Sequence, residues 1–80
     1  MARLRLFAAA REAAGVSDDV VEGATIAEVL AEAQRRYGVD FADILRTSKV
    51  WLNGEESDVS SPVRDSDEIA VLPPVSGGQL

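Results

Sequence analysis

The clearest sign of chemistry in this sequence is its C-terminal stretch, where the side chains shrink step by step. Residues 69–72 form an apolar run that favours a strand, and Pro73 and Pro74 follow directly. Both prolines fix φ and lack an N–H donor, so they hold the exit of the chain extended. Residues 75–78 then end in two glycines, which have no Cβ atom. A tail of this kind can thread a narrow slot in which any side chain would clash.

Residue types that the chain lacks exclude several kinds of chemistry. The sequence contains no cysteine and no histidine. Disulfides, thiolate ligands, a catalytic thiol, a zinc site and a Ser-His-Asp triad are therefore ruled out. We expect no metal site, and because no pair of nucleophile and base can be proposed, we expect no catalysis by the chain alone.

The charge balance bears on partners and location. The chain has 8 basic and 14 acidic residues, a net charge of −6. This excess disfavours nucleic acid and favours partners with basic surfaces, although it could equally serve only to keep a small domain soluble. No apolar run approaches the roughly 20 residues that span a bilayer, and the N-terminus lacks the apolar region of a signal peptide. We expect a cytoplasmic protein that binds neither membrane nor nucleic acid.

The elements that must position the tail begin with a predicted hairpin. Residues 3–7 alternate, which places Leu4 and Leu6 on one side of a half-buried strand. Residues 8–14 are rich in alanine and predict one or two helical turns ended by Gly15. Residues 16–22 predict a second strand, antiparallel to the first, in which either Val20 or Val21 faces inward.

The strongest local pattern predicts a helix over residues 26–37. Apolar residues recur at helical spacing on one face, Thr25 and Glu28 form a capping box, and Gly38 ends the helix. Residues 41–46 predict a short second helix or turn. Residues 49–52 alternate as a strand, and the Asn53-Gly54 dipeptide favours a type I′ turn into a return strand over residues 55–58.

This order of elements predicts an α+β domain of the β-grasp (ubiquitin-like) type. We expect a mixed sheet of four or five strands with one long helix on one face, and a final strand that pairs parallel with the first. The domain would cover residues 1–74. Residues 75–80 would form an extended, flexible C-terminal tail that carries the Gly-Gly pair.

The same alternation places large apolar side chains on the other side of the sheet. If Leu4, Leu6 and their partners face the helix, then Phe7, Trp51 and Leu72 face away from it, with Arg3 and Arg5 nearby. A sheet with helices on one side leaves this face exposed, so we interpret it as a partner-binding patch. Scattered exposed apolar residues are the ordinary alternative.

Three motifs make the chain resemble a known family. They are Leu-Phe-Ala-Ala-Ala-Arg-Glu-Ala-Ala-Gly at residues 6–15, Val-Trp-Leu-Asn-Gly-Glu at residues 50–55, and Asp-Glu-Ile-Ala-Val-Leu-Pro-Pro-Val-Ser-Gly-Gly at residues 67–78. With these, nearly the whole chain resembles the small sulfur-carrier subunit of molybdopterin synthase, a MoaD-type, ubiquitin-like protein. Related carriers serve thiamine, cysteine or secondary-metabolite synthesis, and these alternatives stay open.

The resemblance implies that a carboxylate is the reagent. In the family an E1-like enzyme uses ATP to adenylate the terminal glycine, and a sulfur donor protein then displaces AMP to leave a thiocarboxylate. The large subunit of molybdopterin synthase takes in the tail and passes its sulfur to a pyranopterin precursor, within a heterotetramer. The carrier itself binds no cofactor. It is a non-catalytic, sulfur-donating subunit of a sulfurtransferase.

Family positions carry over to particular residues of this chain. Gly78 would bear the adenylate and then the sulfur, and Gly77 would thread the slot with it. Phe7, Arg11 and Leu72 match family positions that contact the activating enzyme and the large subunit. Pro73 and Pro74 would stiffen the approach of the tail to its partners. Trp51 is a predicted contact only because the alternation of residues 49–52 places it on the side of the sheet away from the helix.

The chain departs from the family after Gly78, where Gln79-Leu80 follows. These two residues would move the carboxylate about 7 Å further out, at ~3.3–3.6 Å per residue. We expect a trimming protease to remove them, or else that they were added for expression or mark a diverged member. Two further functions remain possible: a ubiquitin-like modifier that acylates lysines, and a plain interaction domain.

Overall fold

The computed structural model describes residues 1–74. Residues 75–80, which include Gly77 and Gly78, lie outside the described part, and so does the predicted flexible tail. The described elements follow in the order β1 (Ala2–Leu6), α1 (Ala8–Ala14), β2 (Asp18–Val21), α2 (Ile26–Tyr37), α3 (Val39–Leu45), β3 (Lys49–Leu52), β4 (Glu55–Glu56) and β5 (Glu68–Leu72).

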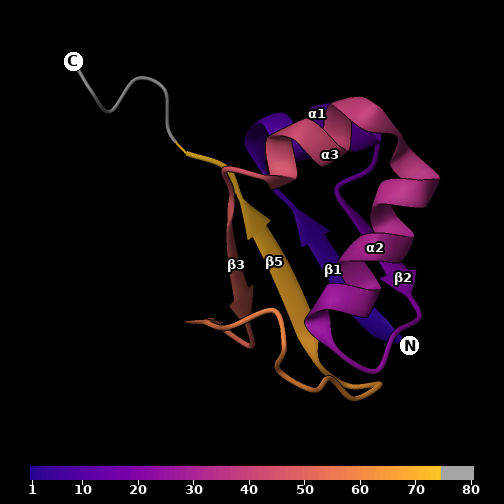
Figure 1. Cartoon of the computed structure of the whole chain (residues 1–80), viewed down its shortest axis with the longest axis vertical. Coiled ribbons are helices and arrows are strands. Elements are labelled where there is room, and N and C mark those ends of the chain that lie inside the picture. The colour runs from indigo at the N-terminus through magenta and orange to yellow at the C-terminus, as the bar shows by residue number, and fades with distance from the viewer. Residues whose placement is uncertain (75–80) are drawn as a thin grey trace.

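The five described strands form one mixed sheet in the order β2-β1-β5-β3-β4. The last strand in the sequence, β5, therefore lies in the middle of the sheet (Figure 1). It pairs parallel with β1, where Leu4 lies opposite Ile69, and antiparallel with β3. The β1–β2 pair is antiparallel. The predicted β-grasp topology is confirmed.

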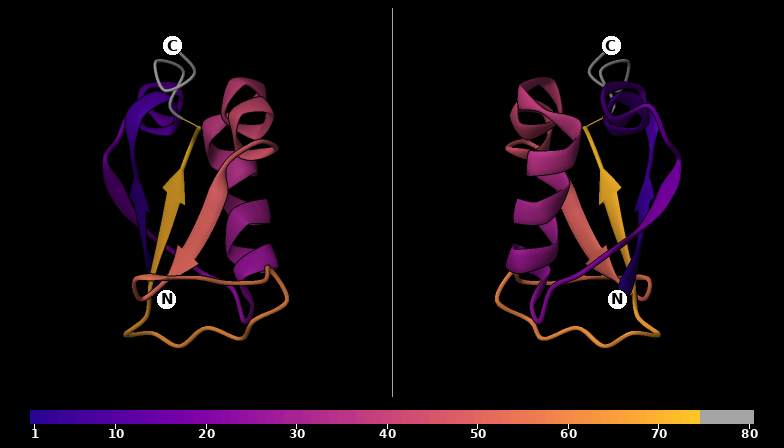
Figure 2. Two further views of the ribbon diagram at one scale, coloured as in Figure 1. Left: turned by 90° about the vertical axis from the view of Figure 1, so that its left-hand side faces the viewer. Right: turned by 90° about the vertical axis from the view of Figure 1, so that its right-hand side faces the viewer.

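The helices lie on one face of the sheet and leave its other face bare (Figures 1 and 2). The core between the two layers is made of fully or nearly buried apolar side chains: Ala2, Leu4, Leu6, Ala10, Val21, Ile26, Val29, Leu30, Ala33, Phe41, Val50, Ile69 and Val71. Both Leu4 and Leu6 belong to this core, as their spacing predicted.

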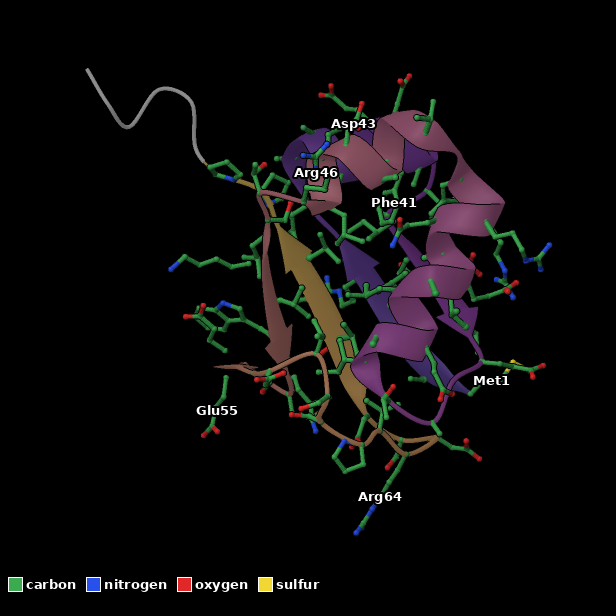
Figure 3. The ribbon with its side chains drawn as sticks, viewed as in Figure 1. Met1, Phe41, Asp43, Arg46, Glu55 and Arg64 are labelled. Atoms are coloured by element: carbon green, nitrogen blue, oxygen red, sulfur yellow. The ribbon has the colours of Figure 1, made fainter. Side chains whose placement is uncertain are left out.

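The predicted long helix over residues 26–37 is present as α2, but the expectation of one helix on the sheet is corrected, because residues 1–74 contain three helices. The 12 residues of α2 span only about 18 Å at 1.5 Å per residue, too little to close both ends of the core. At the far end α1 and α3 pack together and cover it. Ala10 of α1 is buried, and Phe41 of α3 points into the core and is fully buried (Figure 3).

Local signals in the sequence explain where these elements start and stop. The Thr25 hydroxyl accepts a hydrogen bond from the Glu28 N–H at 3.2 Å, which is half of the expected capping box. The Glu28 carboxylate instead accepts from the N–H of Ala24 at 2.9 Å. Asn53 and Gly54 both have positive φ, 52° and 89°, as the predicted type I′ turn requires.

Several boundaries differ from the sequence reading: β2 is shorter than the predicted 16–22, α3 begins two residues before the predicted 41–46, and the return strand is shorter than 55–58. The return strand β4 ends at Glu56, because the Ser60 N–H donates to the Asp58 carboxylate at 2.9 Å and turns the chain away. The sequence left open whether Val20 or Val21 of β2 faces inward. Val21 does, because it is fully buried, whereas Val20 is 49% exposed. No helix in residues 1–74 has the length and apolar character to cross a membrane.

Candidate functional site

The root of the tail lies at one end of the central strand. Leu72, the last residue of β5, lies directly opposite Lys49 of β3, while Val71 lies opposite Leu6 of β1. Pro73 is half-buried and Pro74 is exposed. The chain leaves the domain at the end covered by α1 and α3 (Figure 1). Hydrogen bonds on both sides of β5 therefore fix the position and direction of the exit.

Phe7 and Arg11 come together at this end because Phe7 starts α1. The Phe7 backbone is extended, with φ −125° and ψ 152°, so it continues the alternation of β1 onto the face without helices. The guanidinium of Arg5, on that same face, lies 5.5 Å from the centre of the Phe7 ring. The Phe7 carbonyl accepts from the Arg11 N–H at 3.3 Å, which places Arg11 one turn further along α1, where it is exposed.

Trp51 lies on the predicted face, but it is less exposed than a purely outward side chain. It is opposite Ala70 on one side and Glu56 on the other, and it alternates with buried Val50. The side chain is half-buried. Its indole Nε1 is buried and has no hydrogen-bond partner in the described part of the chain. An unsatisfied buried donor of this kind costs about 1–3 kcal/mol.

We call the face without helices the open face, and its strand pairing defines its members. They are Asp18, Val20, Arg3, Arg5, Glu68, Ala70, Leu72, Lys49, Trp51 and Glu56, and Phe7 joins them by continuing the alternation of β1. Apolar side chains lie among charged ones that pair across strands. Arg5 contacts Glu68 at 3.4 Å, and Lys49 contacts Glu56 at 3.8 Å.

The sequence reading missed Lys49 and Glu68 as members of the open face, although the alternation that placed Trp51 and Leu72 there also places them. It missed the importance of Asn53 as well. The Asn53 amide donates to the Asp67 carboxylate at 3.1 Å, and its oxygen accepts from the Glu68 N–H at 2.9 Å. These bonds fix the register of β3 against β5. The bond from Asn53, with that from the Arg64 N–H, holds the pKa of Asp67 below its usual value.

A second polar contact ties the edge strand β2 to α2 on the helix side. The Tyr37 hydroxyl donates to Asp19 Oδ2 at 2.6 Å, and the Arg36 guanidinium approaches the same oxygen at 3.2 Å. The bond from Tyr37 is the largest cause that lowers the pKa of Asp19, and the charge of Arg36 adds to it. Burial and this same bond raise the pKa of Tyr37.

The arrangement of side chains on the open face provides a surface on which a partner can dock. Within residues 1–74 no group of three or more acidic side chains is placed to hold a metal ion. What the described part does offer is a rigid platform, with a half-apolar open face beside the point where the chain leaves. The predicted contacts Phe7, Trp51 and Leu72 share that face. The fold and this exit together define a ubiquitin-like β-grasp protein.

Comparison with known proteins identifies the family. The family model described as "ThiS family" matches residues 4–78, so the chain belongs to the ThiS family. A molybdopterin synthase sulfur carrier subunit from Anopheles gambiae is 38% identical over 85 aligned positions, which cover 95% of this chain and 90% of that protein. The resemblance inferred from the three sequence motifs is thereby confirmed.

Solved structures agree with this assignment. Small archaeal modifier protein 1 from Methanosarcina acetivorans superposes with a TM-score of 0.84 at 29% identity, covering 96% of this chain and 95% of that one. The complex of subunits 1 and 2 of the molybdopterin-converting factor from Helicobacter pylori contains a chain with a TM-score of 0.73 at 24% identity, covering 96% and 97%. That second likeness shows the shared fold.

Proposed function

We propose that this chain is a sulfur carrier for molybdopterin biosynthesis and the small subunit of a molybdopterin synthase. The observation that carries the proposal is the point at which the chain leaves the domain. The central strand ends at Leu72 beside an open face with half-buried aromatic and apolar side chains, and in the sequence two prolines and then the Gly-Gly pair follow it. Membership of the ThiS family and the identity to a curated sulfur carrier subunit support it.

The reagent in this proposal is the α-carboxylate of Gly78. A carboxylate resists nucleophilic attack until it carries a good leaving group, so its oxygen first attacks the α-phosphorus of ATP and releases pyrophosphate. A hydrosulfide then attacks the carbonyl carbon, the bond to AMP breaks, and AMP leaves with the electron pair. If a protein persulfide delivers the sulfur, a thiol must afterwards reduce the disulfide that forms. The peptide bond between Gly78 and Gln79 must be hydrolysed before any of these steps.

In this proposal the domain takes no part in the chemical steps. It positions the tail for its partners and helps to keep water from the reacting carboxylate. Because β5 is hydrogen-bonded on both sides, the whole sheet sets the point and direction in which the chain leaves at Leu72. Pro73 and Pro74 reduce the conformational entropy lost when the tail enters a slot. A thiocarboxylate is useful only where the reacting atoms are well placed and water is kept out. Gly77 and Gly78 permit such close approach because they lack Cβ atoms.

The partners follow from the steps. An E1-like enzyme would bind the open face through Phe7, Trp51 and Leu72, with Arg11 at its margin, and would hold the ATP. The large subunit would use the same face, in an assembly of two carriers and two large subunits. The Helicobacter pylori protein is solved with its subunit 2, which supports such a pairing here. A sulfur donor protein and a trimming protease complete the set.

Intact mass measurement tests the proposal. A chain that ends at Gly78, mixed with the activating enzyme, ATP and a sulfur donor, should gain the mass of sulfur in exchange for oxygen. The 80-residue chain is the matched control and should not change. Equal thiolation of the 80-residue chain without trimming would overturn the assignment of Gly78, and no thiolation of either chain would overturn the carrier function.

A second candidate is a protein modifier that acylates lysines, supported by the likeness to small archaeal modifier protein 1. Its first step would be the same activation of Gly78. Incubation of the chain ending at Gly78 in a lysate with ATP, followed by mapping of modified lysines, separates the two. Because Arg64 is the last basic residue, trypsin would leave residues 65–78 on each target lysine, and the search must include that remnant.

A further inference from the structure

Lys49 is the one lysine of this chain, and the other seven basic residues are arginines. Arginine is not acylated under ordinary conditions, because its guanidinium stays protonated. A protein whose own carboxylate becomes an acyl donor therefore carries two amines that could attack it. These are the side chain of Lys49 and the N-terminus.

The position of Lys49 brings its amine to the root of the tail. As the first residue of β3 it lies opposite Leu72, the last residue of β5, and their Cα atoms are therefore about 5 Å apart. Both side chains lie on the open face. The Lys49 side chain is 68% exposed, and its ion pair with Glu56 at 3.8 Å is a surface contact that solvent weakens. The amine is therefore accessible, and the pair with Glu56 does not lock it in place.

The reach of the tail distinguishes Lys49 from the N-terminus. Gly78 follows Leu72 by six residues, which span at most about 20 Å, so the amine of Lys49 lies within that radius. Met1 precedes β1, whose Leu6 lies opposite Val71, and it is thus displaced from Leu72 by about 20 Å at 3.3 Å per strand residue. This is the full length of the extended tail, so only a straight tail turned back along the sheet would reach Met1, whereas Lys49 lies well inside the radius. Figure 1 shows the N-terminus at the opposite end of the domain from the exit of the chain. The N-terminal amine is also paired with Asp65.

We propose that Lys49 is an acylation site that captures the chain's own C-terminus, an inference that rests on the proposed activation of Gly78. The lone pair of Lys49 Nζ attacks the carbonyl carbon of a Gly78 acyl adenylate or thioester. The bond to AMP or to the thiol breaks, the leaving group takes the electron pair, and the amine loses a proton to solvent. The product is an isopeptide that closes a ring through residues 49–78. No oxidant or reductant is required.

This site makes the lifetime of the activated chain depend on its partner. A partner that covers the open face also covers Lys49 and draws Gly78 into its slot, so capture is blocked during productive transfer. An activated chain that is released without a partner closes its ring. It then has neither a free carboxylate nor a tail that can be threaded.

The test uses a thioester made without any activating enzyme. The chain ending at Gly78 is released from a C-terminal intein fusion with a small thiol, and its intact mass is followed over time at micromolar concentration. Two variants accompany it. Lys49→Arg removes the amine and keeps the charge, whereas Lys49→Arg with Arg64→Lys moves the one lysine to the end of the domain away from the chain exit (Figure 3). Circular dichroism confirms that both variants are folded.

We expect the unaltered chain to lose one thiol and become a ring, with peptide mapping that joins Gly78 to Lys49. Because a short tether gives an effective concentration near millimolar, ring closure at micromolar protein should exceed cross-linking between copies by roughly three orders of magnitude. Its rate should not depend on protein concentration. Both variants should only hydrolyse to the carboxylate.

Three outcomes overturn the inference. They are hydrolysis of the unaltered chain without a ring, cross-linked dimers in place of rings, and ring closure by the relocated lysine at an equal rate. The proposed sulfur-carrier function is tested separately by enzymatic thiolation. Failure of ring closure with normal thiolation therefore counts against Lys49 alone, and failed thiolation with normal ring closure counts against the carrier function.

Discussion

Replacement of Tyr37 by phenylalanine isolates one hydrogen bond that joins β2 to α2. The hydroxyl donates to Asp19 Oδ2 at 2.6 Å, and nothing else is lost, because the ring packs edge-on against Phe41 with centroids 5.1 Å apart. Asp19 is on the side of the sheet that faces the helices, where its carboxylate requires partners. Tyr37→Phe therefore measures how firmly the edge strand is held.

The expected loss follows from the charge and exposure of the acceptor. A hydrogen bond to a charged group contributes about 1.5–3 kcal/mol. The Asp19 side chain is 33% exposed, so solvent screening favours the lower end, about 1.5 kcal/mol. For a domain of this size, each kcal/mol changes the Tm by about 4–8 °C. Tyr37→Phe should therefore lower the Tm by about 6–12 °C at pH 7.

The pH dependence of this loss has a defined sign. The folded state lowers the pKa of Asp19, so its contribution to stability is present above the ordinary aspartate pKa of about 3.9 and is lost as the pH falls through the lower folded value. The folded state raises the pKa of Tyr37, so the hydroxyl still donates near pH 10, where a free tyrosine ionises. The difference between the two proteins should stay constant from about pH 5 to 9 and shrink in acid.

Urea unfolding of the unaltered chain, Tyr37→Phe, Asp19→Asn and the double variant provides the assay. The double-mutant cycle should give a coupling of about 1 kcal/mol or more at pH 7 and less at pH 3. Thermal unfolding at both pH values is the independent check. A loss of equal size at pH 7 and pH 3, or a coupling near zero, would refute the role assigned to this bond.

Two further substitutions test the open face and the packing beneath α2. Trp51→Ala should weaken binding to the large subunit by about 2 kcal/mol, roughly 30-fold by calorimetry. Its stability should change little, because the burial that is lost is offset by removal of the unpaired buried Nε1; a large fall in Tm with unchanged binding would make Trp51 a core residue instead. Gly23→Ala would place a Cβ 2.6 Å from the backbone nitrogen of Val29. It should cost about 1–3 kcal/mol, seen as a lower Tm, and an unchanged or higher Tm would contradict the tight packing.

The sequence allowed the topology to be predicted because its strongest elements have unambiguous periodicity. The helical spacing of apolar residues in α2 predicts only a helix, and the apolar run in β5 predicts only a strand. β2 was ambiguous, because Val20 and Val21 are adjacent and identical. The structure shows why its alternation is weak: Asp19 takes a position on the helix side, where Tyr37 satisfies it. That partner is distant in sequence and invisible to a local pattern.

The short elements were the least predictable, since packing rather than propensity decides them. Residues 8–14 were predicted to form one or two helical turns ended by Gly15, and α1 has those bounds. Residues 41–46 were predicted as a short helix or turn, whereas α3 runs from Val39 to Leu45 and packs on α1. In the site, alternation correctly placed Trp51 with Phe7 and Leu72. Its half-burial depends on neighbours across two strands, which the sequence alone does not order. The position of Lys49 beside the chain exit was missed because it depends on the register of β3 against β5, which the sequence alone does not give.

The central position of β5 has a consequence for how the molecule is made. β1 and β3 flank β5 and do not pair with each other, so the sheet cannot close until the last strand has been synthesised. During translation the seven elements that precede β5 must wait for a strand that leaves the ribosome late, and contacts so distant in sequence form slowly. A chain truncated before β5 lacks the strand that joins the β2–β1 pair to the β3–β4 pair. The fold thus requires nearly all of the sequence that precedes Gly78, because the strand that joins the two halves of the sheet ends only six residues before it.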